Sequence, residues 1–257
     1  MMTAQTNLPL FYRQIEAFDS ARHGQLCRPA SADFRFAAGA TVIPLVISEL
    51  PLAMRHYPLV FLPGQEGSAP ALAALVGLGD ERNLFVSAEG GWRAGAYIPA
   101  YVRRYPFHAL RVETQADPLL GIDATYTAAK EGETLVGADG KPSTYLDEML
   151  AFCREYLAAG ERTEAMCQAL QEAELLETGD ITLQAAGGVA HQINGFLQVS
   201  ETRLRALTPE ALVMLHQADA LGLAYAQLLS MSNFVHLPLP ATSPLPEKPP
   251  RSRRKRH

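Results

Sequence analysis

The side chains best suited to molecular recognition gather in one stretch, residues 83–110, which contains the only Trp of the chain and an adjacent Arg pair. An Arg guanidinium presents a planar fork of donors that suits carboxylates, phosphates and peptide carbonyls. Aromatic side chains form walls that hold flat or apolar groups. We therefore expect this stretch to bind a peptide, a protein partner or a small anionic ligand. The candidate binding residues are Trp92, Tyr97, Tyr101, Arg103, Arg104 and Tyr105.

A structural interpretation of the same stretch stays open. In it, the aromatic side chains lie in the core and one Arg pairs with a carboxylate of the chain. Pro99 and Pro106 favour a short helix at 99–104 between them. Neighbouring residues on a helix point about 100° apart. Arg103 and Arg104 should therefore differ, one being structural and the other facing a ligand.

The common catalytic motifs are missing from the sequence. It has no GxxxxGK[ST] phosphate loop, no GxGxxG after a strand, no HExxH pair and no GxSxG nucleophile. The seven His residues include no HxD or HxE pair with a suitable distant His, so we expect no metal site and no cofactor. An enzyme acting on a peptide or an anionic metabolite is the alternative. It would require strongly perturbed titrating groups in a cleft beside Arg103.

The three cysteines, Cys27, Cys153 and Cys167, show neither CxxC spacing nor the dense, even count of a small secreted scaffold. We interpret them as reduced thiols. Cys153 and Cys167 fall on or beside the apolar faces of predicted helices. Because free Cys is among the most buried residue types, we expect these two in the core.

Composition is typical of a soluble globular protein, with 257 residues of which 48% are hydrophobic. The N-terminus lacks the basic region and apolar run of a secretory signal. The most apolar segment, residues 218–231, is interrupted by Asp219 and Gln227 and is shorter than the roughly 20 residues of a spanning helix. These features predict a cytoplasmic protein without a transmembrane segment. Its oligomeric state does not follow from the sequence.

The elements expected along residues 1–237 do not alternate regularly, which favours one α+β domain of short strands and helices with a helical C-terminal region. A turn is expected at Asn194-Gly195 and another at Gly187-Gly188. We predict strands at 34–39, 41–46, 57–62, 84–86, 111–114, 121–123, 181–186 and 196–199. We predict helices at 48–56, 70–77 and 99–104, an αα hairpin at 146–157 and 165–176 broken at Gly160, and helix from Thr208 to Ser232.

The last 20 residues, 238–257, differ in character from the rest. They are rich in proline and contain six basic residues against one acidic residue, whereas the rest of the chain is acidic and the net charge is -5. Such a segment cannot bury enough apolar surface to offset its ordering entropy, so we predict a disordered basic tail. The tail is interpreted as a solubilising end. Weak attraction to nucleic acid or anionic lipid is the alternative.

Several separated motifs lie along residues 8–237. They are Tyr57-Pro58-Leu59-Val60-Phe61, Asn83-Leu84-Phe85, Gly91-Trp92, Tyr97-Ile98-Pro99, Arg103-Arg104-Tyr105-Pro106-Phe107, Ile193-Asn194-Gly195-Phe196 and the run 223–231. In type and order these motifs resemble the SapC family of bacterial proteins, which is distinct from the peptide-importer permease of the same name.

The resemblance implies a role but no reaction. The family is named after a surface-layer locus, and its genes are often found beside flavin-dependent halogenases, outer-membrane receptors and cupin-like oxygenases. We therefore expect a SapC-like accessory protein that binds a partner or ligand without catalysis. An enzyme in such a gene neighbourhood and a surface-layer-associated structural protein are the two alternatives.

Overall fold

The computed structural model describes residues 8–28, 32–65, 67–79, 82–112, 115, 117–126, 131–184 and 190–237. Helices and antiparallel sheets are mixed along the chain, which confirms the predicted α+β class. The predicted tail at 238–257 and the predicted Gly187-Gly188 turn lie outside the described residues. Among those residues, none of the helices has the apolar length that crossing a bilayer requires.

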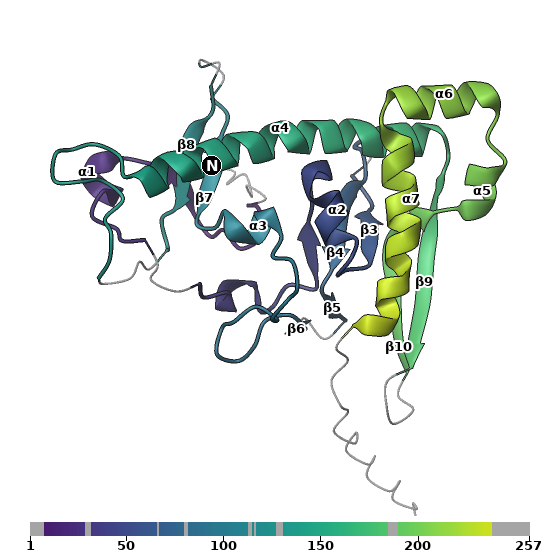
Figure 1. The fold of residues 1–257 in the computed structure, drawn as a ribbon, viewed down its shortest axis with the longest axis horizontal. Coiled ribbons are helices and arrows are strands. Elements are labelled where there is room, and N and C mark those ends of the chain that lie inside the picture. Colours follow the sequence, from purple (N-terminus) through teal and green to yellow (C-terminus); the bar gives the residue numbers. More distant parts are fainter. Residues whose placement is uncertain are drawn as a thin grey trace, which may run out of the picture.

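The larger sheet has five antiparallel strands in the order β2-β4-β3-β10-β9 (Figure 1). Its strands are β2 (Val42–Pro44), β3 (Leu59–Leu62), β4 (Ala71–Leu75), β9 (Leu176–Gln184) and β10 (Ala190–Val199). The central register places Leu59 opposite Ala74 and Phe61 opposite Leu72. All four side chains are buried. This sheet therefore forms the floor of the main core.

A smaller sheet, in the order β1-β8-β7, forms a second core. Its strands are β1 (Ile15–Ala17), β7 (Phe107–Leu110) and β8 (Leu119–Asp123). A third, two-stranded sheet joins β5 (Gly77–Leu78) to β6 (Arg82–Asn83). Short helices lie between the strands: α1 (Ser20–His23), η1 (Arg35–Ala37), η2 (Ile47–Glu49), α2 (Leu50–Ala53) and α3 (Ala100–Arg103).

One long helix, α4 (Thr144–Glu172), connects the two cores. Figure 1 shows it running across the molecule, from beside β7 and β8 to α7 (Ala220–Ser230). Its first half buries Met149 and Cys153 in the smaller core. Its second half buries Met166 and Leu170 in the main core. The relative position of the two sheets is therefore set by one rigid element.

The predicted αα hairpin is wrong, because α4 continues through Gly160 without a break. Ser143 caps the helix by accepting a hydrogen bond from the Leu146 N–H (3.3 Å). A helix-interior glycine costs only about 1 kcal/mol relative to alanine. Burial of one face along both cores outweighs that cost.

The predicted helix at 70–77 is also wrong, since these residues form β4 between β2 and β3. Its apolar run is buried on both faces, and periodicity alone cannot distinguish such a strand from a short buried helix. The segment 34–39 forms the 3₁₀ helix η1 instead of a strand. Asn194-Gly195 forms a bulge inside β10, with positive φ at Gly195 (81°), instead of a turn.

Other local expectations are confirmed. Pro44 is the last residue of β2, which is at the edge of its sheet, and both are positions that a sheet tolerates for proline. Thr208 caps α6 (Pro209–Gln217) by accepting from the Ala211 N–H (3.3 Å). The helix at 99–104 and strands near 57–62, 121–123, 181–186 and 196–199 are present. Segment 84–86 is a turn ending in a bridge. Of the strand expected at 111–114, residues 111–112 follow β7 (Phe107–Leu110) without strand structure, and residues 113–114 lie outside the described residues.

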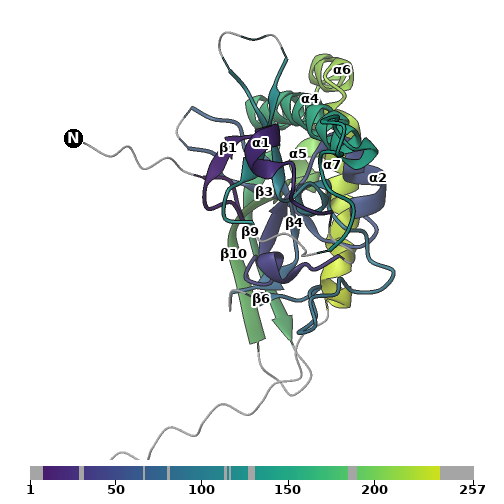
Figure 2. The same cartoon turned by 90° about the vertical axis from the view of Figure 1, so that its left-hand side faces the viewer.

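The C-terminal helical region packs on one face of the larger sheet. It comprises α5 (Glu201–Arg205), α6, α7 and η3 (Met231–His236). Figure 2 shows α2 and α7 on the same face of this sheet. Inside the contact, the buried amide of Gln227 accepts from the Val199 N–H (3.0 Å) and donates to the Leu59 carbonyl (3.1 Å). These bonds hold α7 against β10 and β3.

The three cysteines are buried and free, as expected for reduced thiols. Cys153 lies in the smaller core and Cys167 in the main core. Burial raises the pKa of Cys153 to about 11 and that of Cys167 to about 12. A thiol with so high a pKa is a poor nucleophile at neutral pH, so their role is packing.

Two glycine substitutions should change stability in opposite directions. An ideal Cβ at Gly160 meets nothing within 4 Å, so Gly160→Ala should raise the free energy of unfolding by about 0.5–1 kcal/mol. At Gly179 in β9, a Cβ would lie 2.0 Å from the Phe196 ring, so Gly179→Ala should lower the free energy of unfolding by about 1–3 kcal/mol. Urea unfolding of both variants beside the wild type measures the difference. A loss of stability in Gly160→Ala would contradict a continuous α4.

Candidate functional site

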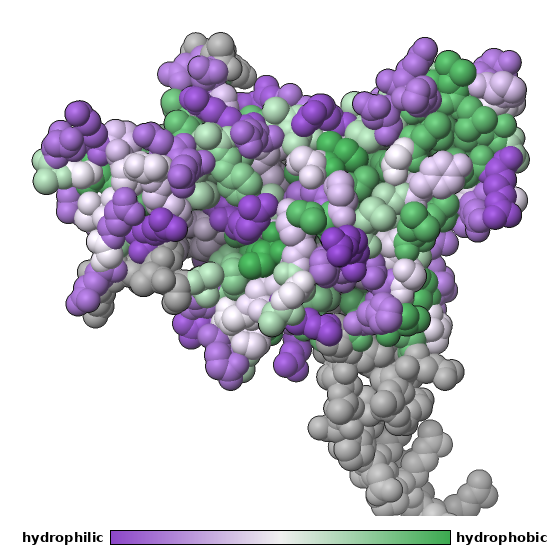
Figure 3. Space-filling view, in the orientation of Figure 1, coloured by the Kyte–Doolittle hydropathy of each residue, from purple (hydrophilic) through white to green (hydrophobic). Residues whose placement is uncertain are grey.

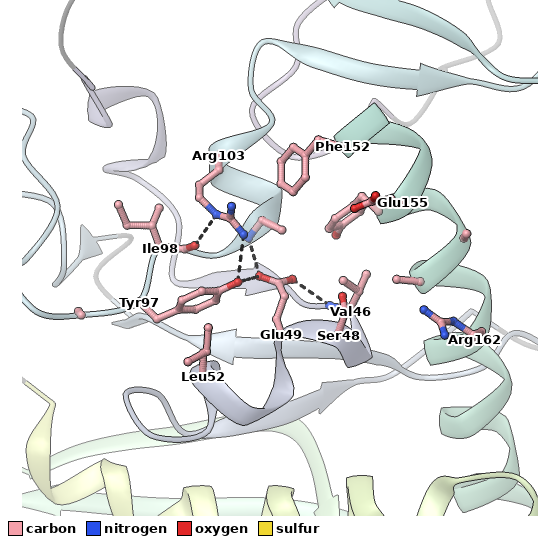
Figure 4. Close-up of a pocket in the computed structure, with 15 residues that line it drawn as sticks. Val46, Ser48, Glu49, Leu52, Tyr97, Ile98, Arg103, Phe152, Glu155 and Arg162 are labelled. Carbon is pink, nitrogen blue, oxygen red and sulfur yellow. Dashed lines mark hydrogen bonds between the residues drawn. The ribbon is translucent and has the colours of Figure 1, made fainter. Parts of the chain in front are cut away.

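A groove of about 820 Å³ lies beneath the middle of α4 (Figure 4). One wall consists of α4, and the other consists of η2, the start of α2, and the loop that leads into α3. Its lining residues are Val46, Ser48, Glu49, Leu52, Ala96, Tyr97, Ile98, Ala100, Arg103, Phe152, Glu155, Tyr156, Ala158, Ala159 and Arg162. Of the predicted binding residues, Tyr97 and Arg103 therefore face a cavity together.

Glu49 is the centre of the wall opposite α4. Its side chain is buried, with 3% of its surface exposed. One carboxylate oxygen accepts from the Ala100 N–H and the Tyr97 hydroxyl (3.0 Å), and the other accepts from the Val46 N–H (3.1 Å). A buried carboxylate needs such donors. The three bonds therefore fasten the start of α3 to η2, the short helix that carries Glu49.

Tyr97 is held at both its backbone and its side chain. Its hydroxyl lies between Glu49 and Arg103, and its carbonyl accepts a hydrogen bond from the Tyr57 hydroxyl. The Tyr57 oxygen in turn accepts from Trp92 Nε1 (3.1 Å). Trp92 does not line the groove but supports Tyr97 from behind. Its predicted part in binding therefore reduces, in this geometry, to positioning.

Arg103 is exposed and comes from the last turn of α3, with its guanidinium at the groove (Figure 4). Nε donates to the Ile98 carbonyl (3.0 Å) and Nη2 donates to the Tyr97 hydroxyl (3.1 Å). The Cζ atom also lies 4.9 Å from the centroid of the Phe152 ring on α4. These contacts fix the orientation of the cation while leaving Nη1 without a hydrogen bond to the described residues.

A second cation, Arg162, lies farther along α4. Figure 4 shows its guanidinium directed towards the wall that carries Val46 and Ser48. Phe152 and Arg162 are about 15 Å apart along the helix axis. Between Phe152 and Arg162 the α4 wall presents Glu155, Tyr156, Ala158 and Ala159. The groove thus has an Arg near each end, with apolar and aromatic groups and the Glu155 carboxylate between them.

Arg104 occupies a different environment, in which only 4% of its surface is exposed. Its Cζ atom lies 4.2 Å from the Tyr101 ring centroid, 4.4 Å from that of Tyr156 and 5.8 Å from that of Tyr12. The unequal roles expected of Arg103 and Arg104 match this geometry. The expected carboxylate partner does not, because the salt bridges between described residues do not include Arg104. Aromatic faces take its place.

The remaining candidates lie away from the groove. Tyr101 is buried and donates to the Leu10 carbonyl (3.1 Å). Tyr105 stacks on Phe36, with ring centroids 4.3 Å apart, and donates to Asp123 (3.3 Å). The structure therefore divides the predicted set: Tyr97 and Arg103 line the groove, whereas Trp92, Tyr101, Arg104 and Tyr105 support its surroundings.

Four groove residues were missed by the sequence analysis: Glu49, Phe152, Tyr156 and Arg162. Three of them lie on α4, whose distance in sequence from Arg103 gives no local spacing to detect. Glu49 did carry a signal, because it stands three residues after Val46 and reaches back to its N–H, as the acid of a capping box does. Ser48, predicted to cap this helix, is exposed instead.

The groove contains titrating groups with shifted pKa values. Burial raises the pKa of Glu49, although the Ala100 and Val46 N–H groups oppose the shift. Burial also raises the pKa of Tyr97, and the nearby Glu49 charge adds to this. Among the described residues, no group of three or more His, Cys, Asp or Glu side chains is placed to hold a metal ion. The lining residues supply hydrogen-bonding groups, charges and apolar surface.

Replacing each Arg by Met should separate the two roles. Arg104→Met removes contacts with three aromatic faces, each worth roughly 0.5–2 kcal/mol, but also removes a buried charge. We expect a net loss of about 1–3 kcal/mol in the free energy of unfolding, against about 1 kcal/mol or less for Arg103→Met. Thermal and urea unfolding measure both. Equal losses would contradict the assignment of Arg104 as the structural residue.

Because of Glu49, the free energy of unfolding should fall as the pH rises above the ordinary pKa of a glutamate. The folded protein holds the Glu49 proton to a higher pH than the unfolded chain does, so folding becomes less favourable as that proton is lost. The wild type should therefore lose stability relative to Glu49→Gln between about pH 4.5 and neutral pH. Urea unfolding over this range measures the difference. Glu155→Gln controls for removing one charge at the groove, and parallel curves for wild type and Glu49→Gln would refute the shift.

Comparison with known protein families covers the part of the chain that forms the groove. A family model described as SapC matches residues 18–237, which include the five-stranded sheet, α4 and every residue of the groove. Comparisons with curated proteins and with solved structures gave no match. The match spans most of the 257 residues and stops where the structural description stops. The chain belongs to the SapC family.

Proposed function

We propose that this protein is an accessory binding protein, and that its groove takes a ligand with an apolar body and a carboxylate head. The observation that carries the proposal is the placement of Arg103. Ile98 and Tyr97 fix its guanidinium at the groove, and Nη1 stays available to an incoming oxygen. A charge-assisted hydrogen bond of this kind contributes about 1.5–3 kcal/mol.

The charges around the groove support an anionic head. The chain before its basic tail is acidic, yet this groove is lined by two Arg residues. Against them stand the exposed Glu155 and the buried Glu49, whose carboxylate already accepts hydrogen bonds from Val46, Ala100 and Tyr97. Local potential therefore favours an anion here more than elsewhere on the acidic surface.

The remaining lining supports an apolar body. Leu52, Ile98, Phe152 and the two alanines of α4 give the groove mostly apolar walls. Its volume is in the range of sites that hold small molecules or a few residues of a peptide. A carboxylate side chain or a C-terminus of a peptide would satisfy the same requirements as a free aliphatic or aromatic acid.

Glu49 is the feature that most favours the enzymatic alternative, because it is a perturbed acid beside Arg103. Both of its oxygens, however, already accept hydrogen bonds from Val46, Ala100 and Tyr97. A general base needs an oxygen directed at substrate. We therefore assign Glu49 to positioning and propose binding without a reaction.

A fluorescent anion tests the proposal directly. 1-Anilinonaphthalene-8-sulfonate combines an aromatic body with a sulfonate, and octanoate supplies a carboxylate competitor. We expect the wild type to bind the dye saturably and octanoate to displace it. Arg103→Met should weaken dye binding at least about tenfold, and Arg103→Lys should recover part of the loss, because a point charge cannot reproduce the planar fork.

The matched control is Arg154→Met, which removes an exposed Arg from α4 outside the groove and should leave dye binding unchanged. Arg162→Met should weaken binding less than Arg103→Met, since no hydrogen bond between described residues orients Arg162. Equal affinity in wild type and Arg103→Met, with both folded, would refute the groove as the site.

A further inference from the structure

Helix α7 exposes an apolar face to solvent. The helix contains no charged residue, and Tyr225 and Leu229 are 54% and 65% exposed. The apolar side of a surface helix normally faces the core. Here Gly222, Tyr225 and Leu229 are exposed and recur at the spacing of one helical face, beside the face that packs on the sheet. We call these three residues, with Ala218, the α7 face.

A hollow adjoins the α7 face. Its volume is about 630 Å³, and it lies between α7, α2 and the second half of α4. Small residues, Ala218, Gly222 and Ala226, line the side formed by α7, and an ideal Cβ on Gly222 meets nothing within 4 Å. Leu50 and Met54 line the side formed by α2. The α7 face therefore combines two protruding side chains with a neighbouring recess.

Apolar exposure is concentrated in this region. Of the ten large hydrophobic side chains that are exposed among the described residues, six lie between positions 212 and 235. Figure 3 shows apolar surface over α6 and along α7 in the view of Figure 1. The six are Leu212, Val213, Met214, Tyr225, Leu229 and Val235. Such a concentration marks an interaction surface better than scattered exposed residues do.

We propose that the α7 face binds the same face of a second copy of this chain and forms a twofold-symmetric dimer. A twofold interface requires one patch to complement itself, and this patch carries both protrusions and a recess. In an antiparallel pair of α7 helices with the axis between residues 225 and 226, Leu229 of each copy lies opposite Gly222 of the other. The absent side chain at Gly222 leaves room for Leu229 at that crossing.

Charge favours a second copy over a charged partner. The chain before its tail is acidic, so most surfaces of two copies repel each other. The α7 face is the exception, because α7 has no charged side chain. The recess beside it is lined by one residue of each sign, Arg162 and Asp219, so a partner with a strong net charge finds no net opposite charge there, whereas a second copy brings no net charge to the contact. Burial of Tyr225 and Leu229 from each copy supplies the apolar centre that stable interfaces contain.

Sedimentation velocity of the full chain over a range of concentrations tests the dimer. We expect the wild type to sediment with twice the 27.9 kDa mass of the chain, and Leu229→Glu to weaken dimerisation at least about tenfold. Tyr225→Glu should act in the same direction. Leu119→Glu, which alters an exposed Leu on β8, should remain dimeric. Circular dichroism and the melting temperature confirm that each variant is folded.

Two results would overturn the proposal. One is a wild type that stays monomeric at millimolar concentration, and the other is a dimer that Leu229→Glu and Tyr225→Glu leave intact. Flotation with phosphatidylcholine vesicles tests whether the α7 face binds lipid instead of a second copy of the chain. A monomeric wild type that floats with vesicles, and loses this in folded Leu229→Glu, would show that the face meets lipid instead.

Discussion

A carboxylate removed from water must find hydrogen-bond donors, and in this protein that requirement organises the groove. Glu49 is buried where the loop before α3 passes η2, and its carboxylate accepts hydrogen bonds from the Val46 N–H, the Ala100 N–H and the Tyr97 hydroxyl. Because these donors belong to two separate segments, satisfying one charge fixes one wall of the cavity. Tyr97 is then in place to orient Arg103. The orientation of the exposed Arg103 guanidinium therefore depends on the buried Glu49 carboxylate through the Tyr97 hydroxyl.

The Arg pair shows how one short helix serves two environments. Arg103 faces solvent and is oriented by hydrogen bonds, so its charge remains hydrated and available. Arg104 points into the interior, where aromatic faces stand in for a carboxylate and Nε has no partner among the described residues. Tyr156 joins the two, because it covers Arg104 and also lines the groove. The structural interpretation of the stretch therefore fits Arg104, and the proposed binding role falls on the adjacent Arg103.

The sequence predicted the fold class and the segments whose signals are local. Thr208 before a proline, the proline in β2 and the proline-bounded helix at 99–104 each specify their own structure. The structures at Gly160 and at residues 71–75 are not specified locally. Burial against distant strands decides whether Gly160 breaks its helix and whether residues 71–75 form a helix or a strand. Within the groove, Tyr97 and Arg103 were predicted from residue type alone. Phe152, Tyr156 and Arg162 approach them only because α4 crosses both cores.

Helix α4 also separates the two proposed binding surfaces along its length. Beside its middle lies the groove, in which Tyr97 orients Arg103. Beside its end lies the hollow next to the α7 face, where helix α7 itself carries no charge. Arg162 borders both cavities, and Figure 4 shows its guanidinium directed towards the groove wall that carries Val46 and Ser48. The proposed pairing of α7 faces would therefore leave that charge available to the proposed anion site.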